Sequence, residues 1–171
     1  MKERLSTGLL GVLLLTLGVC SAARHMDFVG DDVLIIERVR ALRGLAHTGE
    51  YFRFGFFSFY RPLTFLSHAL DWQIWGLDPR GYHLTNVLLH LVNTCLVWVI
   101  ARRLMPALGA TVAASLFAVH TSNHEAVFWI SGRFDVMAAS CTLAAFWLMT
   151  GTPFWRYGLG LAAFGLGLLS K

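Results

Sequence analysis

The sequence predicts an all-α integral membrane protein with about five transmembrane helices and two amphipathic interfacial helices in one long loop. Of the 171 residues, 56% are hydrophobic and 14% are charged, and the mean hydropathy is +0.59. Soluble domains usually carry about 25% charged residues, so this composition favours a membrane class. The formal net charge of +4 is modest, and the basic residues form no patch for nucleic acid.

Residues 1–23 are predicted to form the first helix or a signal anchor. A basic start precedes an apolar run from Leu9 to Val19, and small residues follow it. A cleaved signal peptide has the same pattern. A helix over Leu5–Ala23, however, is close to the roughly 20 residues that cross a bilayer. Because more apolar segments follow, we favour an uncleaved first helix.

Residues 24–81 are predicted to be a loop outside the membrane that carries the two amphipathic helices. Apolar residues from Val33 to Leu45 have helical spacing, with arginines between them. Residues Leu63–Trp75 repeat the pattern and include two tryptophans. Arginine and tryptophan on such helices suit the headgroup layer of a membrane. We therefore expect both helices to lie on the membrane surface.

Residues 82–171 are predicted to hold four further spans. They are expected at Tyr82–Leu104, Ala107–Val119, Ala126–Thr150 and Phe154–Ser170. The second of these is short, since roughly 17–25 residues usually span a bilayer.

Basic residues in short loops favour the cytoplasmic side. When the predicted spans are counted along this chain, the basic residues of its short loops all fall on one side of the membrane. These residues are Lys2, Arg4, Arg102, Arg103 and Arg156. This predicts a cytoplasmic N-terminus. The loop of residues 24–81 is then periplasmic, or lumenal in the endoplasmic reticulum of a eukaryotic cell.

Four polar residues of the second span are spaced for one helix face: His83, Asn86, His90 and Asn93. At 1.5 Å per residue the stripe descends about 15 Å. Polar side chains are costly against lipid, so this face should line the bundle interior or a wet cavity. Hydrogen bonding between helices, without chemistry, is the alternative.

Charged residues recur near the same predicted membrane face. Asp31 and Asp32 follow the first span, and a carboxylate there can take a proton from a hydroxyl group. Arg133 interrupts an apolar stretch, where a guanidinium suits a phosphate or a carboxylate. The alternative for Arg133 is a structural ion pair with Asp135 or Glu125.

A metal site is the weaker interpretation of the histidines. His120 and His124 have the i, i+4 spacing that can bind zinc, and Glu125 adjoins them. The second histidine of the metalloprotease motif is missing, however. We predict no metal site and no required cofactor, although a divalent metal is compatible with this pair.

In the predicted topology eight candidates meet at the outer membrane face: Asp31, Asp32, Arg61, His83, His120, His124, Glu125 and Arg133. Carboxylates beside cations at a hydrophobic interface suit a substrate with a lipid tail and an anionic head. A cation could hold a leaving phosphate while a carboxylate acts as base. This indicates group transfer from a lipid-linked phosphate. The alternatives are a transporter or flippase for an anionic lipid and a non-catalytic membrane scaffold.

At these residues the chain resembles the transmembrane and tetratricopeptide-repeat-containing O-mannosyltransferase family, within the GT-C class of polyprenyl-phosphate-sugar transferases. The match runs from residue 27 to the end of the chain, and several motifs occur in order. The matching stretches are Asp27-Phe28-Val29-Gly30-Asp31-Asp32, Tyr60-Arg61-Pro62-Leu63-Thr64, Trp75-Gly76-Leu77-Asp78-Pro79, Tyr82-His83-Leu84, Asn86, His90, Leu116-Phe117-Ala118-Val119-His120, His124-Glu125-Ala126-Val127 and Gly132-Arg133-Phe134-Asp135. One departure is Thr121-Ser122-Asn123, where the family has a proline-containing stretch.

The resemblance implies a mannosyl transfer, with inversion, from a polyprenyl-phosphate donor to a hydroxyl group of a protein or glycan. Membrane lipids would be its other partners. It also implies that the chain is the N-terminal part of a longer protein, whose further spans and repeats would follow Lys171. One of Asp31 and Asp32 would be the catalytic base, and we favour Asp32. The residues expected to bind the substrate or its phosphate are Arg61, His83, Asn86, His90, His120, His124, Glu125, Arg133 and Asp135.

Overall fold

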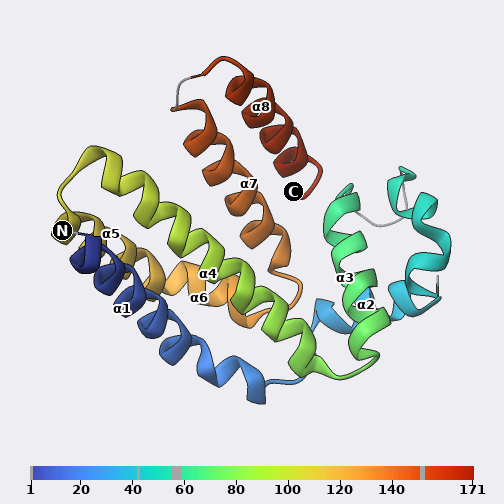
Figure 1. Ribbon diagram of the computed structural model, residues 1–171. Helices are drawn as coiled ribbons and strands as arrows, with labels where there is room; N and C mark the ends of the chain where they lie inside the picture. The colour runs from blue at the N-terminus through green and yellow to red at the C-terminus, as the bar shows by residue number, and fades with distance from the viewer. Residues whose placement is uncertain (1, 42, 55–58, 151–152) are drawn as a thin grey trace.

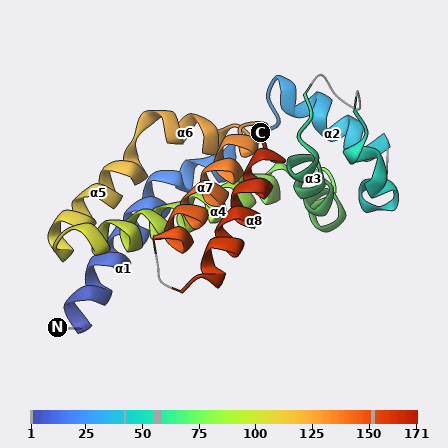
Figure 2. The ribbon, with the colours of Figure 1, turned by 90° about the horizontal axis from the view of Figure 1, so that it is seen from above.

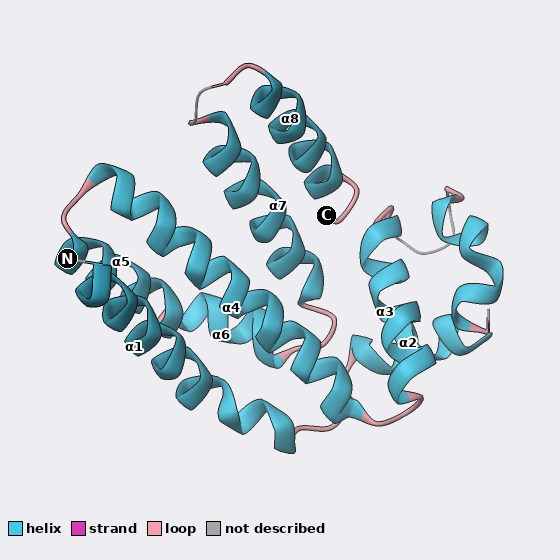
Figure 3. Ribbon diagram, in the orientation of Figure 1, coloured by secondary structure: helices cyan, strands magenta, loops and turns pink. Residues whose placement is uncertain are grey.

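The described part of the chain folds into helices and the turns between them (Figures 1 and 3). This computed structural model describes residues 2–41, 43–54, 59–150 and 153–171, and within those ranges it contains no β-strand. The predicted all-α class is therefore confirmed for the described part of the chain.

Three long helices form one packed group: α1 (Lys2–Cys20), α4 (Pro79–Leu104) and α5 (Ala107–Val119). Their shared core contains Val12, Trp98, Ala110 and Ala114. The small alanines let the backbones approach closely. A short 3₁₀ helix, η1 (Ser21–His25), follows α1.

The start of α4 is fixed by a local cap. The Asp78 side chain accepts a hydrogen bond from the Arg80 backbone N–H at 3.0 Å, and Pro79 occupies the first helical position. The helix therefore begins three residues before the predicted Tyr82 and ends at the predicted Leu104. The predicted bounds of α5 are confirmed without change.

The predicted fourth span, Ala126–Thr150, is wrong as a single helix. Residues Thr121–Phe128 form α6, and α7 covers Arg133–Met149. The amide of Asn86 explains the break, because it donates to the carbonyl oxygens of Val127 and Trp129 at 3.3 and 2.9 Å. These bonds satisfy backbone groups that the end of α6 leaves without helical partners.

Helix α8 (Trp155–Leu168) lies antiparallel to α7 (Figure 1). It matches the predicted fifth span to within one or two residues. Two glycines allow the close packing: a Cβ on Gly160 would meet Met149 Cγ at 2.7 Å, and one on Gly167 would meet Cys141 Cβ at 3.1 Å.

The loop after η1 folds into α2 (Asp31–Ala41), the 3₁₀ segment η2 (Gly44–Phe52) and α3 (Pro62–Trp75). Their core contains Val39, Tyr51, Phe65 and Ala69. The prediction of helix α3 is confirmed. These elements thus bury a core of their own, in addition to any surface that they offer to a membrane.

The predicted helix from Val33 to Leu45 is too long. Helix α2 ends at Ala41, Leu42 lies outside the described residues, and Leu45 belongs to η2. Arg43 and Gly44 have φ values of 53° and 59°, which turn the chain through the left-handed region. A Cβ on Gly44 would also meet the Trp72 ring at 2.7 Å.

Two described helices are long and apolar enough to cross a membrane, Thr7–His25 and Pro79–Leu104, and α5 is a shorter apolar helix. The five-span topology and its orientation stay predictions. Helices α2 and α3 lie beyond the end of the bundle where α1 ends and α4 begins (Figures 1 and 2). Helix α7 also starts at that end, and the candidate site lies there.

Candidate functional site

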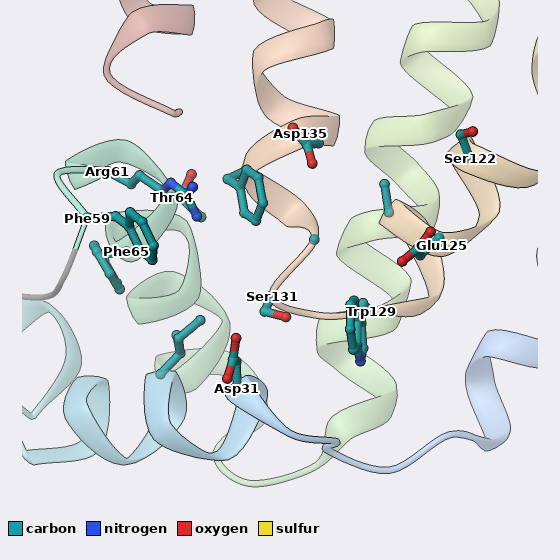
Figure 4. A pocket seen from close by; sticks show the side chains of 14 residues that line it. Asp31, Phe59, Arg61, Thr64, Phe65, Ser122, Glu125, Trp129, Ser131 and Asp135 are labelled. Atoms are coloured by element: carbon teal, nitrogen blue, oxygen red, sulfur yellow. The ribbon is translucent and has the colours of Figure 1, made fainter.

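A cavity of about 460 Å³, here called the Asp31 cavity, opens where α2, α3, α6 and the start of α7 meet (Figure 4). Its size falls in the range of ligand sites. Ser122 and Glu125 lie across it from Phe59 and Arg61. Its lining residues are Asp31, Ile35, Phe59, Arg61, Thr64, Phe65, Ser122, Glu125, Ala126, Trp129, Ser131, Gly132, Phe134 and Asp135.

The two adjacent aspartates have different surroundings. Asp31 is exposed in the first turn of α2, and its carboxylate points into the cavity (Figure 4). Asp32 is fully buried. One of its oxygens accepts from the Ser131 backbone N–H at 2.6 Å, and the other accepts from the Val29 N–H at 3.1 Å. Asp31 is thus free to meet a ligand, whereas Asp32 caps α2 and ties it to the link before α7.

Arg61 supplies the positive charge of the cavity wall. Its guanidinium lies 3.7 Å from the Phe134 ring centroid and 4.6 Å from that of Phe59. Its Nε–H donates to the Lys171 carbonyl oxygen at 3.3 Å. Partial burial lowers the pKa of Arg61, and the carboxylate of Asp135 acts in the opposite direction. Two aromatic rings therefore hold this cation in place.

The position of Arg61 also depends on the contact between the start of α3 and the end of α8. The Leu63 backbone N–H donates to the Leu169 carbonyl at 3.2 Å, and the Thr64 hydroxyl donates to the Ser170 carbonyl at 2.8 Å. The partial positive charge of one helix start meets the negative end of another, which stabilises the contact.

Two further predicted residues, Glu125 and Asp135, belong to the same cavity wall. Asp135 Oδ1 lies 2.7 Å from Lys171 Nζ in a half-exposed ion pair. Glu125 is exposed on α6. The structure therefore brings together Asp31, Arg61, Glu125 and Asp135, which are distant in the sequence.

Arg133 lies outside this cavity wall and is fully buried. Its Nη1 lies 2.5 Å from Asp71 Oδ2. The other nitrogens donate to Asn86 Oδ1 at 2.7 Å and to the Tyr82 carbonyl at 2.8 Å, and Nη1 also donates to Ser67 Oγ at 3.1 Å. The alternative given for Arg133, a structural ion pair, is therefore present, but its partner is Asp71 and neither Asp135 nor Glu125.

Asp71 was not among the predicted residues. Its Oδ1 accepts from the Thr85 hydroxyl at 2.8 Å, so it joins α3 to both α4 and α7. The sequence did contain a signal for a buried acid at this position. Asp71 lies between Leu70 and Trp72 and three residues after His68, within an apolar helix. Acids on apolar helix faces are rarely buried without a partner.

The polar stripe of α4 is buried over its whole length, at His83, Asn86, His90 and Asn93. Asn93 donates to the Val136 carbonyl at 3.0 Å, and Asn86 acts as described above. His90 and Asn93 also line a second cavity of about 330 Å³, here called the His90 cavity. Both expected roles therefore occur: the asparagines hold helices together, and the deeper half of the stripe faces a cavity.

The two remaining histidines among the predicted site residues, His120 and His124, contact nearby backbone groups. His120 Nδ1 accepts from the Ser122 backbone N–H at 3.3 Å and caps α6. This cap begins α6 at the Thr121-Ser122-Asn123 stretch without a proline. His124 Nε2 lies 3.2 Å from the Ala118 carbonyl. Among the described residues, no three His, Cys, Asp or Glu side chains gather in a way that could hold a metal ion.

Comparison with known proteins confirms the resemblance that the motifs indicate. The chain is 46% identical over 88 residues to "Protein O-mannosyl-transferase Tmtc1" of Drosophila melanogaster, covering 51% of this chain and 10% of that protein. It is 40% identical over 121 residues to Tmtc2 of the same organism, covering 63% and 13%. It is 40% identical over 89 residues to human TMTC1, covering 51% and 10%.

The chain thus spans about a tenth of the length of the curated relatives it matches. No family model matches the chain. No solved structure matches it either.

Proposed function

We propose that the chain forms part of a membrane-bound glycosyltransferase that moves mannose from a polyprenyl-phosphate donor to a hydroxyl group of a protein. The observation that carries this proposal is the shared cavity of Asp31 and Arg61 at one end of an apolar helix bundle. The names of the relatives, protein O-mannosyl-transferases, support the sugar and the protein acceptor.

Asp31 acts as the catalytic base in this proposal. Its carboxylate takes the proton of the acceptor hydroxyl as that oxygen attacks the anomeric carbon. The new carbon–oxygen bond forms on the face opposite the phosphate, so the configuration is inverted. The bond from the anomeric carbon to the phosphate oxygen breaks, and the lipid phosphate leaves with the electron pair.

The contacts support Asp31 over Asp32, although the sequence favours Asp32. Both oxygens of Asp32 already accept backbone hydrogen bonds, and its side chain is buried. To take a proton from a substrate, Asp32 would first have to become accessible, because its side chain is fully buried. Asp31 makes no such demand, since its exposed carboxylate faces the cavity.

Arg61 stabilises the leaving phosphate in this proposal. Charge grows on the phosphate oxygens as the sugar departs, and a fixed guanidinium nearby lowers the energy of that state. Arg133 is less suited, because Asp71 and three other groups already occupy its nitrogens. Arg133 instead positions α3 against α7.

The test compares Asp31→Asn with Asp32→Asn in the native polypeptide that carries this sequence, reconstituted in vesicles. The assay follows mannose from polyprenyl-phosphate mannose to a protein hydroxyl. Asp31→Asn should lower the transfer rate about 10²–10⁴-fold, the usual contribution of a general base. Asp32→Asn should retain more activity per folded molecule.

Unchanged transfer by Asp31→Asn would refute its role as base. Absence of mannose transfer by the wild-type protein would refute the function itself. Movement of the lipid across the vesicle membrane, without transfer, would favour the transporter alternative.

A further inference from the structure

Beside the Asp31 cavity lies the His90 cavity, which takes no part in the proton transfer or the phosphate binding proposed above. It is lined by His90, Asn93, Phe117, Ser122, Asn123, Ala126, Asp135, Val136 and Ala139. Three of these residues, Ser122, Ala126 and Asp135, also line the Asp31 cavity. The two cavities therefore share a wall made by α6 and the first turn of α7.

The polar groups of the His90 cavity are mainly hydrogen-bond acceptors. Asn93 is 1% exposed, and its Oδ1 has no hydrogen-bond partner among the described residues. A buried acceptor without a partner raises the free energy of the folded protein. A ligand that donates to this acceptor therefore gains more binding free energy than an average hydrogen bond provides.

His90 adds a second acceptor. Its Nε2 lies 3.3 Å from the Ala118 carbonyl oxygen. A carbonyl can only accept, so this contact places the proton on Nε2, and in the neutral ring Nδ1 is then an acceptor. The ring is held in this orientation by stacking on Phe117, with 5.5 Å between centroids.

The two cavities differ in the charged residues that line them. None of the described residues that line the His90 cavity is a lysine or an arginine. Asp135 contributes a carboxylate, of which Oδ1 pairs with Lys171 and the other oxygen has further acceptor capacity. The amide of Asn123 is already engaged, because it donates to the Phe117 carbonyl at 2.7 Å. The His90 cavity therefore has no cationic side chain in its described wall to bind an anion, whereas the Asp31 cavity has Arg61, beside the carboxylates of Asp31, Glu125 and Asp135.

We infer that the His90 cavity is a subsite for a neutral, hydroxyl-rich group, the sugar ring of the lipid-linked donor. Sugar hydroxyls donate hydrogen bonds, which Asn93 Oδ1, His90 Nδ1 and the Asp135 carboxylate would accept. A cavity of about 330 Å³ is at the small end of ligand sites, in keeping with a single ring. This inference rests on the proposed function, and it adds that the His90 cavity is the part of the protein that selects the sugar.

The test measures how strongly the native polypeptide, in lipid nanodiscs, prefers polyprenyl-phosphate mannose over polyprenyl phosphate. The preference is the ratio of the two dissociation constants, so effects on lipid or phosphate binding cancel. Direct binding of methyl mannoside, measured by saturation-transfer NMR, is the second readout. It reports the subsite without the lipid.

Two variants change the cavity by different means. His90→Gln keeps an N–H that can reach the Ala118 carbonyl, but its amide oxygen does not occupy the position of the Nδ1 acceptor. Ala139→Leu fills the cavity and leaves every polar group in place. His90→Gln should reduce the mannose preference about tenfold, which is the loss of one good hydrogen bond. Ala139→Leu should reduce it at least as much, because the added side chain takes the space of the sugar ring. Each should also weaken binding of methyl mannoside.

Matched controls exist for both variants. His25 is exposed and lines neither cavity. His25→Gln makes the same substitution there and should leave the mannose preference at its wild-type value. Ala144→Leu adds the same bulk on α7 outside both cavity walls, and it should also leave the preference unchanged.

The outcomes separate this inference from the proposed function. An unchanged preference and unchanged methyl mannoside binding in both His90→Gln and Ala139→Leu would overturn the subsite, even if Asp31-dependent transfer is observed. His90-dependent methyl mannoside binding in a protein that transfers no mannose would support the subsite and refute the proposed function. If only methyl mannoside binding depends on His90, the ring that binds there belongs to a glycan acceptor, and the donor assignment is overturned.

Discussion

The carboxylate of Asp71 and the guanidinium of Arg133 form a buried ion pair, with 2.5 Å between Oδ2 and Nη1. Asp71 lies on α3, in the loop segment, and Arg133 is the first residue of α7. The pair therefore fixes the helix that follows Arg61 against the helix that carries Asp135. This pair therefore holds the two walls of the Asp31 cavity together, along with the contact between the start of α3 and the end of α8.

We expect Asp71→Ala to lower the free energy of unfolding by about 3–5 kcal/mol, because the charge of Arg133 would remain buried without its partner. The double variant Asp71→Leu with Arg133→Met should recover much of this loss, since both charges are removed together. Equilibrium unfolding in detergent micelles measures both. Glu50→Ala is the control: it breaks the exposed pair with Arg53 and should cost less than about 1 kcal/mol. A loss as small as that for Asp71→Ala would show that the buried pair does not hold the two walls.

The next prediction concerns Asp32, which makes a reciprocal cap with Val29. The Asp32 backbone N–H donates to the Val29 carbonyl, and the Asp32 side chain accepts from the Val29 N–H, both at 3.1 Å. Asp32→Ala also leaves the Ser131 backbone N–H without its acceptor, so the free energy of unfolding should fall by about 1–3 kcal/mol.

Asp31→Ala provides the comparison for Asp32. It removes only a favourable charge from the first turn of α2 and should cost about 0.3–1 kcal/mol. The measurement is the free energy of unfolding of Asp31→Ala and of Asp32→Ala, each compared with the wild type under the same conditions. Equal losses would mean that the two aspartates do not have the separate roles described above.

The third prediction concerns pH and His68. Burial, and to a smaller extent the charge of Arg133, lower the pKa of His68 well below its usual 6.5. As the pH falls below 6.5, the unfolded chain binds a proton that the folded chain does not. Stability from this residue is therefore complete above pH 6.5 and is lost on acidification, by at most about 1.4 kcal/mol per pH unit.

His68→Phe should remove this part of the pH dependence, because phenylalanine fills a similar space without a titrating group. The measurement is the free energy of unfolding over a pH series on both sides of 6.5. His25→Gln, at an exposed position, is the control. The prediction is wrong if His68→Phe and the wild type lose stability in parallel below pH 6.5.

Local sequence patterns predicted the elements whose boundaries are set locally. Helix α5 has its predicted bounds, and α3 and α4 begin one and three residues earlier than expected. In each case an apolar stretch, a proline near the start or an aspartate cap determines the helix.

Long-range contacts set the features that the sequence did not predict. The end of α6 depends on the amide of Asn86, which comes from another helix. The partner of Arg133 is Asp71, and no spacing rule joins the two positions. The different surroundings of Asp31 and Asp32 likewise depend on Ser131, which reaches Asp32 only in the folded chain.

The final prediction tests the link between α6 and α7 at Gly132. A Cβ on this residue would lie 2.7 Å from the Ala126 carbonyl oxygen and 2.9 Å from Ala126 Cα. These are backbone atoms of α6, so they cannot move aside as a flexible side chain would. Gly132→Ala should therefore lower the free energy of unfolding by about 1–3 kcal/mol. Gly11→Ala, at a helical position of α1 with nothing within 4 Å, should instead stabilise the protein by up to about 1 kcal/mol. If both variants unfold with the wild-type free energy, the close approach of Gly132 to Ala126 does not constrain the link between α6 and α7.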